Sequence, residues 1–160
     1  MCNSYRDYVQ ELFREKSSDK IGNDKIENAI VLYEAIFMYA QEKVRIFCNN
    51  MDARVFSNDS VCTALGGALT RGVKLDIIVK TTPEKSNALP ILVANKDKVR
   101  MFRGGDFTSE DKPVNFVVMD NCGYRFEYNS ANPCAVACAN DPTFASQLKQ
   151  AFDSALPVAS

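Results

Sequence analysis

The chain has 160 residues and a mass of 17.8 kDa, of which 46% are hydrophobic and 24% charged, a size and balance that suit one globular domain. The net charge is −1, with 19 basic and 20 acidic residues, so no overall field draws the protein to nucleic acid or an anionic membrane. Any such binding needs a local patch. The chain has no histidine, which excludes an imidazole nucleophile or base of its own.

The six cysteines follow no disulfide-framework spacing, and the N-terminus shows no basic-then-apolar signal segment. We therefore expect the reducing cytoplasm as the location. The longest apolar run, residues 29–40, is interrupted by Glu34 and is shorter than the roughly 20 residues that a membrane-spanning helix needs. We expect no transmembrane segment and no membrane partner.

Apolar residues at helical spacing predict two helices at the start of the chain. Ser4 can cap the first, which continues to about Phe13. Residues 17–23 are mostly polar and are typical of a loop. The second helix is expected from Asp24 to about Glu42, and its apolar stripe is wide enough for a helix that is covered on two sides.

The next segments predict a parallel strand–helix–strand unit. Residues 44–48 form a short strand, and Asn58 or Ser60 can cap a helix that Gly72 ends. Residues 73–79 begin with alternation and end as an apolar run, which predicts a central strand buried on both faces. Short connections then favour a right-handed parallel crossover.

The second half of the chain predicts one further helix and strand before a loop. The helix is expected over residues 83–95 with a break near Pro90, the strand over residues 99–103, and the polar loop over residues 104–112.

Three strands and a closing helix are expected to follow. The strands cover residues 115–119, 124–128 and 134–139, with a tight hairpin turn at residues 121–123. Asp141 or Thr143 can cap the final helix, which runs to about residue 156.

Two segments carry a resemblance to a known family. They are ALTRGVKLDIIV, residues 68–79, and NFVVMDNCGYRFE, residues 115–127, and a helical stretch at residues 139–156 follows them. Over about residues 25–156 the chain resembles one domain of the phospholipase D superfamily. The resemblance implies an α/β fold, a single domain at residues 24–160 with a mixed sheet flanked by helices, and an N-terminal helical arm at residues 1–23.

The family motif is His-x-Lys-x4-Asp, in which the histidine attacks phosphorus, the lysine holds phosphate oxygens and the aspartate supports the histidine. Counted back from Asp120, the histidine position holds Pro113 and the lysine position holds Asn115. Proline has no titratable nitrogen, and asparagine offers a neutral donor where a cation would offset charge. The family's downstream Gly-Ser-x-Asn is also altered, since its spacing falls on residues 127–130. We therefore expect the family reaction to fail.

A rebuilt active site is an alternative. Asp120, Cys122, Arg125 and Glu127 could combine acid, base and cation, because Arg125 and Glu127 alternate on one face of a strand. The competing interpretation is that Arg125 and Glu127 form a surface ion pair that stabilises the hairpin. A nucleophilic cysteine also needs a base or an electropositive site, and no histidine is present to activate Cys122.

No metal or cofactor is expected. Cys134 and Cys138 lack Cys-x-x-Cys spacing and would lie about 13 Å apart along a strand, too far for one zinc ion. Small buried cysteines are the better interpretation.

Charge is sparse in the C-terminal third, with six charged residues in 113–160 against fifteen in 1–47. This region is the expected core or interface. The leading hypothesis is a catalytically inactive module that acts in protein–protein association, as the homodimer that the resemblance implies or as an accessory or regulatory subunit of a larger assembly.

A nucleic-acid-binding module is the second hypothesis. It would use the residual phosphate groove, with contacts from Arg100, Arg103, Lys112 and Asn115. An enzyme built on the rearranged residues around Cys122 is the third.

Overall fold

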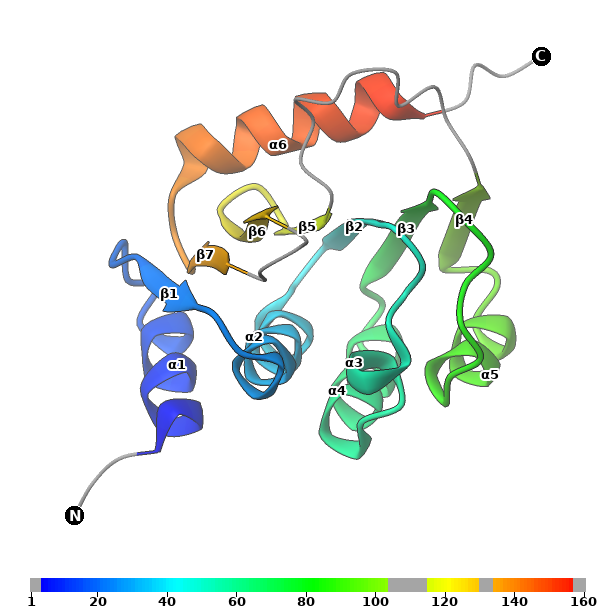
Figure 1. Ribbon diagram of the computed structural model, residues 1–160, viewed down its shortest axis with the longest axis horizontal. Coiled ribbons are helices and arrows are strands. Elements are labelled where there is room, and N and C mark those ends of the chain that lie inside the picture. Colours follow the sequence, from blue (N-terminus) through cyan, green and yellow to red (C-terminus); the bar gives the residue numbers. More distant parts are fainter. Residues whose placement is uncertain (1–3, 104–114, 130–133, 157–160) are drawn as a thin grey trace.

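The computed structural model describes residues 4–103, 115–129 and 134–156. Seven strands form one mixed sheet in the order β1-β7-β6-β5-β2-β3-β4. Helices α1 to α5 lie on one face of this sheet, and α6 crosses the other face (Figure 1). The strands are β1 (Ile21–Asn23), β2 (Lys43–Cys48), β3 (Lys74–Val79), β4 (Val99–Arg103), β5 (Asn115–Met119), β6 (Gly123–Asn129) and β7 (Cys134–Cys138). The helices are α1 (Tyr5–Arg14), α2 (Ile26–Tyr39), α3 (Ala53–Phe56), α4 (Asp59–Thr70), α5 (Ala88–Ala94) and α6 (Pro142–Ala155).

The N-terminal helices confirm the sequence pattern and refine its limits. Ser4 caps α1 by accepting a hydrogen bond from the backbone N–H of Asp7 at 3.1 Å. Helix α2 ends at Tyr39, earlier than expected, because Ala40 has an extended backbone (φ −62°, ψ 139°) that turns the chain toward β2.

Residues 17–23 were predicted to be a loop, which is confirmed for residues 17–20 and wrong for residues 21–23. Ile21–Asn23 is strand β1, which pairs antiparallel with β7 at the edge of the sheet. Its inward residues are buried and its middle residue is exposed. Residues 21–23 therefore belong to the same sheet as the rest of the chain, while the division into an arm and a domain stays a prediction.

The parallel pairing of β2 and β3 around α4 is confirmed. The side chain of Asn58 caps α4 by accepting from two backbone N–H groups, and Gly72 follows the helix with φ +95°, which favours glycine. Five of the six residues of β3 are buried, as expected for a central strand. Strand β4 extends the parallel part of the sheet.

Helix α5 is shorter than predicted and is not broken at Pro90. It begins at Ala88, so Pro90 falls in the first turn, where a missing N–H costs no intrahelical hydrogen bond. The expected loop at residues 104–112 lies outside the described residues.

The strands and closing helix of the C-terminal third are confirmed. Strands β5, β6 and β7 form an antiparallel meander, and Met119 pairs with Gly123 across the first turn. The turn therefore starts one residue earlier than expected, at Asp120, whose φ is +53°. Asp141 caps α6 by accepting from the N–H of Phe144.

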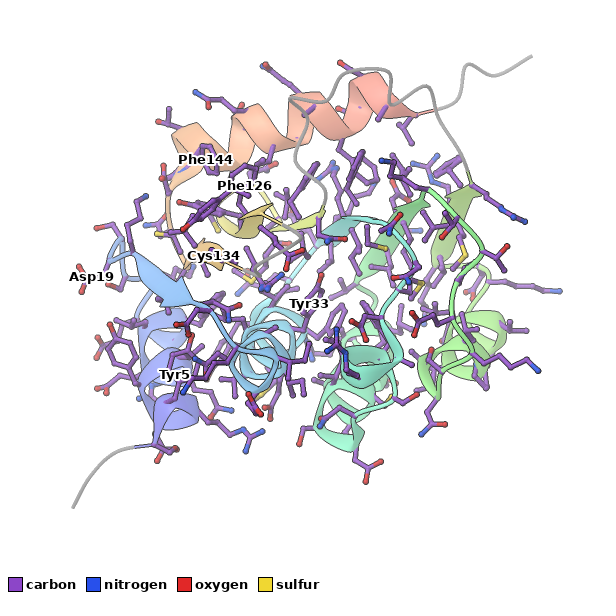
Figure 2. The ribbon with its side chains drawn as sticks, in the orientation of Figure 1. Tyr5, Asp19, Tyr33, Phe126, Cys134 and Phe144 are labelled. Carbon is purple, nitrogen blue, oxygen red and sulfur yellow. The ribbon has the colours of Figure 1, made fainter. Side chains whose placement is uncertain are left out.

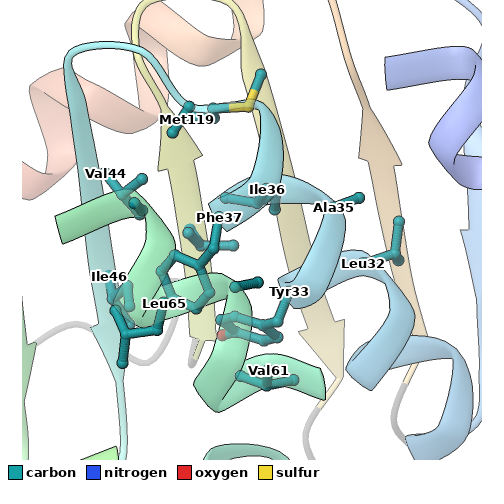
Figure 3. Close-up of a cluster of buried hydrophobic side chains, with 14 of the residues drawn as sticks. Leu32, Tyr33, Ala35, Ile36, Phe37, Val44, Ile46, Val61, Leu65 and Met119 are labelled. Carbon is teal, nitrogen blue, oxygen red and sulfur yellow. The ribbon is translucent and has the colours of Figure 1, made fainter. Parts of the chain in front are cut away.

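Two apolar layers hold the sheet between its helices. Phe37 of α2 and Leu65 of α4 pack with Ile46, an inward residue of β2 (Figure 3). On the opposite face, α6 packs against β2, β5 and β6, and Phe144 meets Phe126 edge to face at 5.4 Å (Figure 2). In the part of the chain described here, no helix is long and apolar enough to cross a membrane.

Candidate functional site

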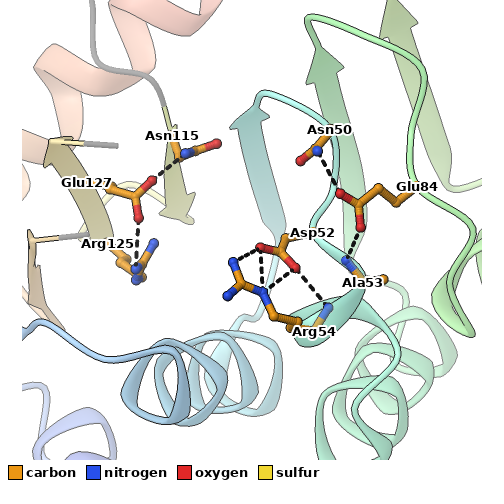
Figure 4. A network of polar contacts seen from close by, with 8 residues as sticks. All are labelled: Asn50, Asp52, Ala53, Arg54, Glu84, Asn115, Arg125 and Glu127. Carbon is orange, nitrogen blue, oxygen red and sulfur yellow. Dashed lines mark hydrogen bonds and ion pairs between the residues drawn. The ribbon is translucent and has the colours of Figure 1, made fainter. Parts of the chain in front are cut away.

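A pocket of about 450 Å³ opens on the α2 side of the sheet, where β2 ends and β5 begins. The loop after β2 and helix α3 form one wall, and the ends of β5 and β6 form the other (Figure 4). Its polar lining residues are Lys25, Asn49, Asn50, Asp52, Arg54, Asn115, Arg125 and Glu127.

The side chain of Asn115 is held at both ends. Its Nδ2 donates to the carboxylate of Glu127, the cross-strand neighbour on β6 (Figure 4), and its Oδ1 accepts from the backbone N–H of Asn49 at 3.0 Å. The carboxamide therefore joins the two walls of the pocket.

Arg125 and Glu127 form a buried pair rather than the surface pair considered from the sequence. Their side chains are 5% and 12% exposed, and the guanidinium lies 3.6 Å from the carboxylate. Strand β1 and helix α2 provide the cover. Arg125 Nε donates to Oδ1 of Asn23 at 2.7 Å, and the guanidinium lies 5.7 Å from the centre of the Tyr33 ring.

Cys48 and Tyr33 also line this pocket, but both stay protonated at neutral pH. Burial raises the pKa of the Cys48 thiol to about 12, so the thiol is neutral near pH 7. Burial also raises the pKa of Tyr33, against an opposing effect of the nearby Arg125 charge. Neither group is an activated nucleophile or base.

The wall formed by the loop after β2 and helix α3 holds a polar cluster that sequence reasoning did not identify (Figure 4). Asp52 caps α3 and receives hydrogen bonds from both the backbone and the guanidinium of Arg54, which lowers the pKa of its carboxyl. Glu84 accepts from Asn50 Nδ2 at 2.7 Å and from the N–H of Ala53 at 3.0 Å. An aspartate just before a helical turn is a signal for the cap, but no local signal brings Glu84 to it.

Asp120 lies at the other end of β5, away from Asn115. Its carboxylate accepts three backbone N–H groups, from Gln41 at 3.0 Å, Glu42 at 2.8 Å and Lys43 at 2.9 Å. This places Asp120 in a structural role, as the clamp between the hairpin turn and the start of β2.

Cys122 lies in the same turn, with Sγ 3.9 Å from the carbonyl oxygen of Met119. Burial, and then the charge of Asp120, raises the pKa of its thiol. The structure thus does not bring Asp120 and Cys122 to the Arg125–Glu127 pair. Among the described residues, no group of three or more cysteine, aspartate or glutamate side chains could hold a metal ion.

Comparison with known proteins identifies the fold. No family model and no curated protein sequence matches the chain. Among solved structures, Nuc of Salmonella typhimurium, a phospholipase D family member, is 18% identical with a TM-score of 0.55, and the match covers 86% of this chain and 94% of Nuc. NucT of Helicobacter pylori is 10% identical with a TM-score of 0.58, over 86% of this chain and 96% of NucT. The chain has a phospholipase D-like fold.

The same phospholipase D-like fold occurs within a longer protein. TrmBL2, an archaeal chromatin protein described with a novel mode of DNA binding, is 16% identical with a TM-score of 0.57 over 84% of this chain. This chain spans half of the TrmBL2 chain. At these identities the matches show the fold alone.

Of the residues proposed for a phosphate groove, Arg100 and Asn115 lie on opposite faces of the sheet. Arg100 lies on the α6 face of the sheet, where it pairs with Asp76, whereas Asn115 points to the α2 side. Arg103 donates to Oγ1 of Thr82 at 2.6 Å. Pro113 and Lys112 lie outside the described residues. Alternate residues of a strand point to opposite faces of the sheet, and the positions of Arg100 on β4 and Asn115 on β5 direct their side chains to different faces. These two residues therefore do not line one groove.

Proposed function

We propose that this chain is a catalytically inactive phospholipase D-like module that acts through protein contacts, as a homodimer or as an accessory or regulatory subunit. The observation that carries the proposal is the pairing of Asn115 with Glu127 in a chain that has no histidine. Asn115 stands at the position that the resemblance assigns to the family's lysine.

The electrostatics of the pocket support the loss of phosphoryl chemistry. A phosphate next to Asn115 would meet the carboxylate of Glu127, and like charges at a site of low dielectric repel strongly. Arg125 is a buried cation in the same pocket, but its Nε donates to Asn23 and its guanidinium pairs with Glu127. The fixed dipoles and charges that would stabilise a phosphoryl transition state are thus replaced by internal pairing.

Exposed apolar side chains at the β4 edge support association. Val93 on α5 is 72% exposed and Met101 on β4 is 39% exposed, although both are large and apolar. Among the described residues, β4 pairs only with β3. An open edge with apolar neighbours is a surface that a second chain can cover.

Two measurements test this function. Incubation with a chromogenic phosphodiester and with plasmid DNA should give no turnover above buffer, and turnover that disappears in Asn115→Ala would contradict inactivity. Light scattering after size exclusion should give twice 17.8 kDa, or the mass of a complex with a copurifying protein.

A matched pair of variants locates the contact. Val93→Asp should weaken the association, while Tyr8→Asp, at an exposed apolar residue on α1, should leave it unchanged. A wild-type monomer that copurifies with no protein would refute the role in association.

A further inference from the structure

Four basic side chains lie together on the α6 face of the sheet, at the end where β2 and β3 begin. They are Lys43 and Arg45 on β2, Lys74 on β3 and Arg100 on β4, and we name them the basic corner. The strand register aligns Arg45, Asp76 and Arg100 in one row and places Lys43 beside Lys74 in the next. The pocket lined by Asn115 opens on the opposite face.

One buried carboxylate anchors the basic corner. Asp76 is 3% exposed and accepts from Lys43 Nζ at 2.7 Å and from Arg100 Nε and Nη2 at 2.8 and 2.6 Å. Burial acts to raise the pKa of Asp76, but the hydrogen bonds from Arg100 and Lys43 outweigh it and hold the pKa below its usual value. Asp76 is therefore ionised at neutral pH and offsets one of the four positive charges.

The other two cations have no such partner. Arg45 is half-buried and Lys74 is exposed, and neither makes a side-chain hydrogen bond or ion pair among the described residues. Lys74 also lies directly beside Lys43 in the register, and like charges in that arrangement destabilise a sheet. The corner thus carries a net charge of about +3, and two of its four cations make no side-chain hydrogen bond or ion pair among the described residues.

We propose that the basic corner binds the phosphodiester backbone of single-stranded nucleic acid. Strands lie about 4.8 Å apart and alternate residues about 6.6 Å apart, so the four cations cover about 10 Å, or about three nucleotides at 3.4 Å each. The Phe102 ring, partly buried on the same face, lies 5.4 Å from the Arg100 guanidinium. The planar guanidinium, 60% exposed as part of its side chain, offers a surface on which a base stacks.

The shape of the surface favours this ligand over two others. The four cations lie on strands within the sheet, and none lies on a helix or two-stranded ribbon that could enter a duplex groove. Among the described residues, no exposed large apolar side chain lies on the α6 face of β2, β3 or β4 to insert into a bilayer.

The test measures binding of a labelled oligothymidylate of about 20 nucleotides by fluorescence anisotropy, from about 20 to 200 mM salt. With three phosphates neutralised, the logarithm of the binding constant should fall with the logarithm of salt with a slope of about −2. Arg45→Gln with Lys74→Gln should weaken binding at least tenfold at low salt and reduce the slope by about 1.4. This double variant leaves the Asp76 contacts intact, and its urea denaturation midpoint checks that the fold is kept.

The matched control is Lys85→Gln with Lys96→Gln, which removes two exposed charges elsewhere. Its binding and slope should equal those of the wild type. Absent binding at low salt, or an equal loss in both double variants, would overturn the proposal. So would competition by polyglutamate as effective as by the unlabelled oligonucleotide, or equally tight binding to phosphatidylserine vesicles, since these results assign the corner to an acidic protein or a membrane.

Discussion

Asp120 should be required for stability because its carboxylate holds three backbone N–H groups at the start of β2. Asp120→Asn keeps the oxygen that accepts from Glu42 and Lys43 but turns an amide donor toward the N–H of Gln41. Loss of one partly exposed bond to a charged acceptor, with a donor facing a donor, costs about 2 kcal/mol. For a chain of this length the melting temperature should fall by about 4–8 °C.

Asp120→Ala should cost more, because it removes all three hydrogen bonds and places alanine at φ +53°. Three bonds at about 1 kcal/mol each and about 1 kcal/mol for the left-handed backbone give about 4 kcal/mol. Urea denaturation followed by circular dichroism gives both values.

Asp153→Asn is the control, since it removes the same charge at an exposed position on α6 where no side-chain contact is present among the described residues. It should change stability by less than about 0.5 kcal/mol. If Asp120→Asn were as mild as this control, the clamp would be refuted.

Three other changes probe the described interactions. Arg125→Leu should lower the free energy of unfolding, measured by urea denaturation, by about 3–5 kcal/mol because it leaves Glu127 buried without its cation. The double variant with Glu127→Leu should recover part of that loss. A double variant less stable than the single one would contradict the importance of this pair. Gly123→Ala should lower the free energy of unfolding by about 1–3 kcal/mol, since the added Cβ would lie 2.8 Å from Cε of Met119 and 3.2 Å from the backbone oxygen of Ala139. An unchanged melting temperature would contradict this steric conflict. The pKa of Asp76 is lowered in the folded protein, so its ionised form stabilises the fold above about pH 4, and this contribution is lost as pH falls through the folded pKa. The stability advantage of the wild type over Asp76→Asn, measured by urea denaturation, should therefore shrink between about pH 5 and 2. A constant advantage would argue against the ion pairs.

Elements with a strong period were predictable from the sequence, and elements that depend on distant partners were not. Helices α1, α4 and α6 carry their caps and apolar stripes within a few residues, and β3 has an apolar run that only a central strand explains. Strand β1 has three residues and becomes a strand only by pairing with β7, more than a hundred residues later.

The candidate site shows the same limit. The alternation of Arg125 and Glu127 correctly predicted that they share a face, but their burial depends on Asn23 and on α2, which no spacing on β6 reveals. Asp120 looked like a survivor of a catalytic motif, whereas its partners are backbone groups at 41–43. For Arg100, strand parity was the missing information, since it decides which face the side chain takes.

The pairing of β1 with β7 has a consequence for how the chain matures on the ribosome. Lys20, next to β1, donates to the hydroxyl of Tyr124 at 3.1 Å and pairs with the carboxylate of Asp141, so residues 20–23 can reach their native contacts only after residues 124–141 have been synthesised. A variant that starts at residue 24 would lack β1, so β7 would become an unpaired edge strand and Arg125 would lose its hydrogen bond to Asn23. We expect this variant to aggregate. Anyone who trims this protein for study should therefore keep its opening segment.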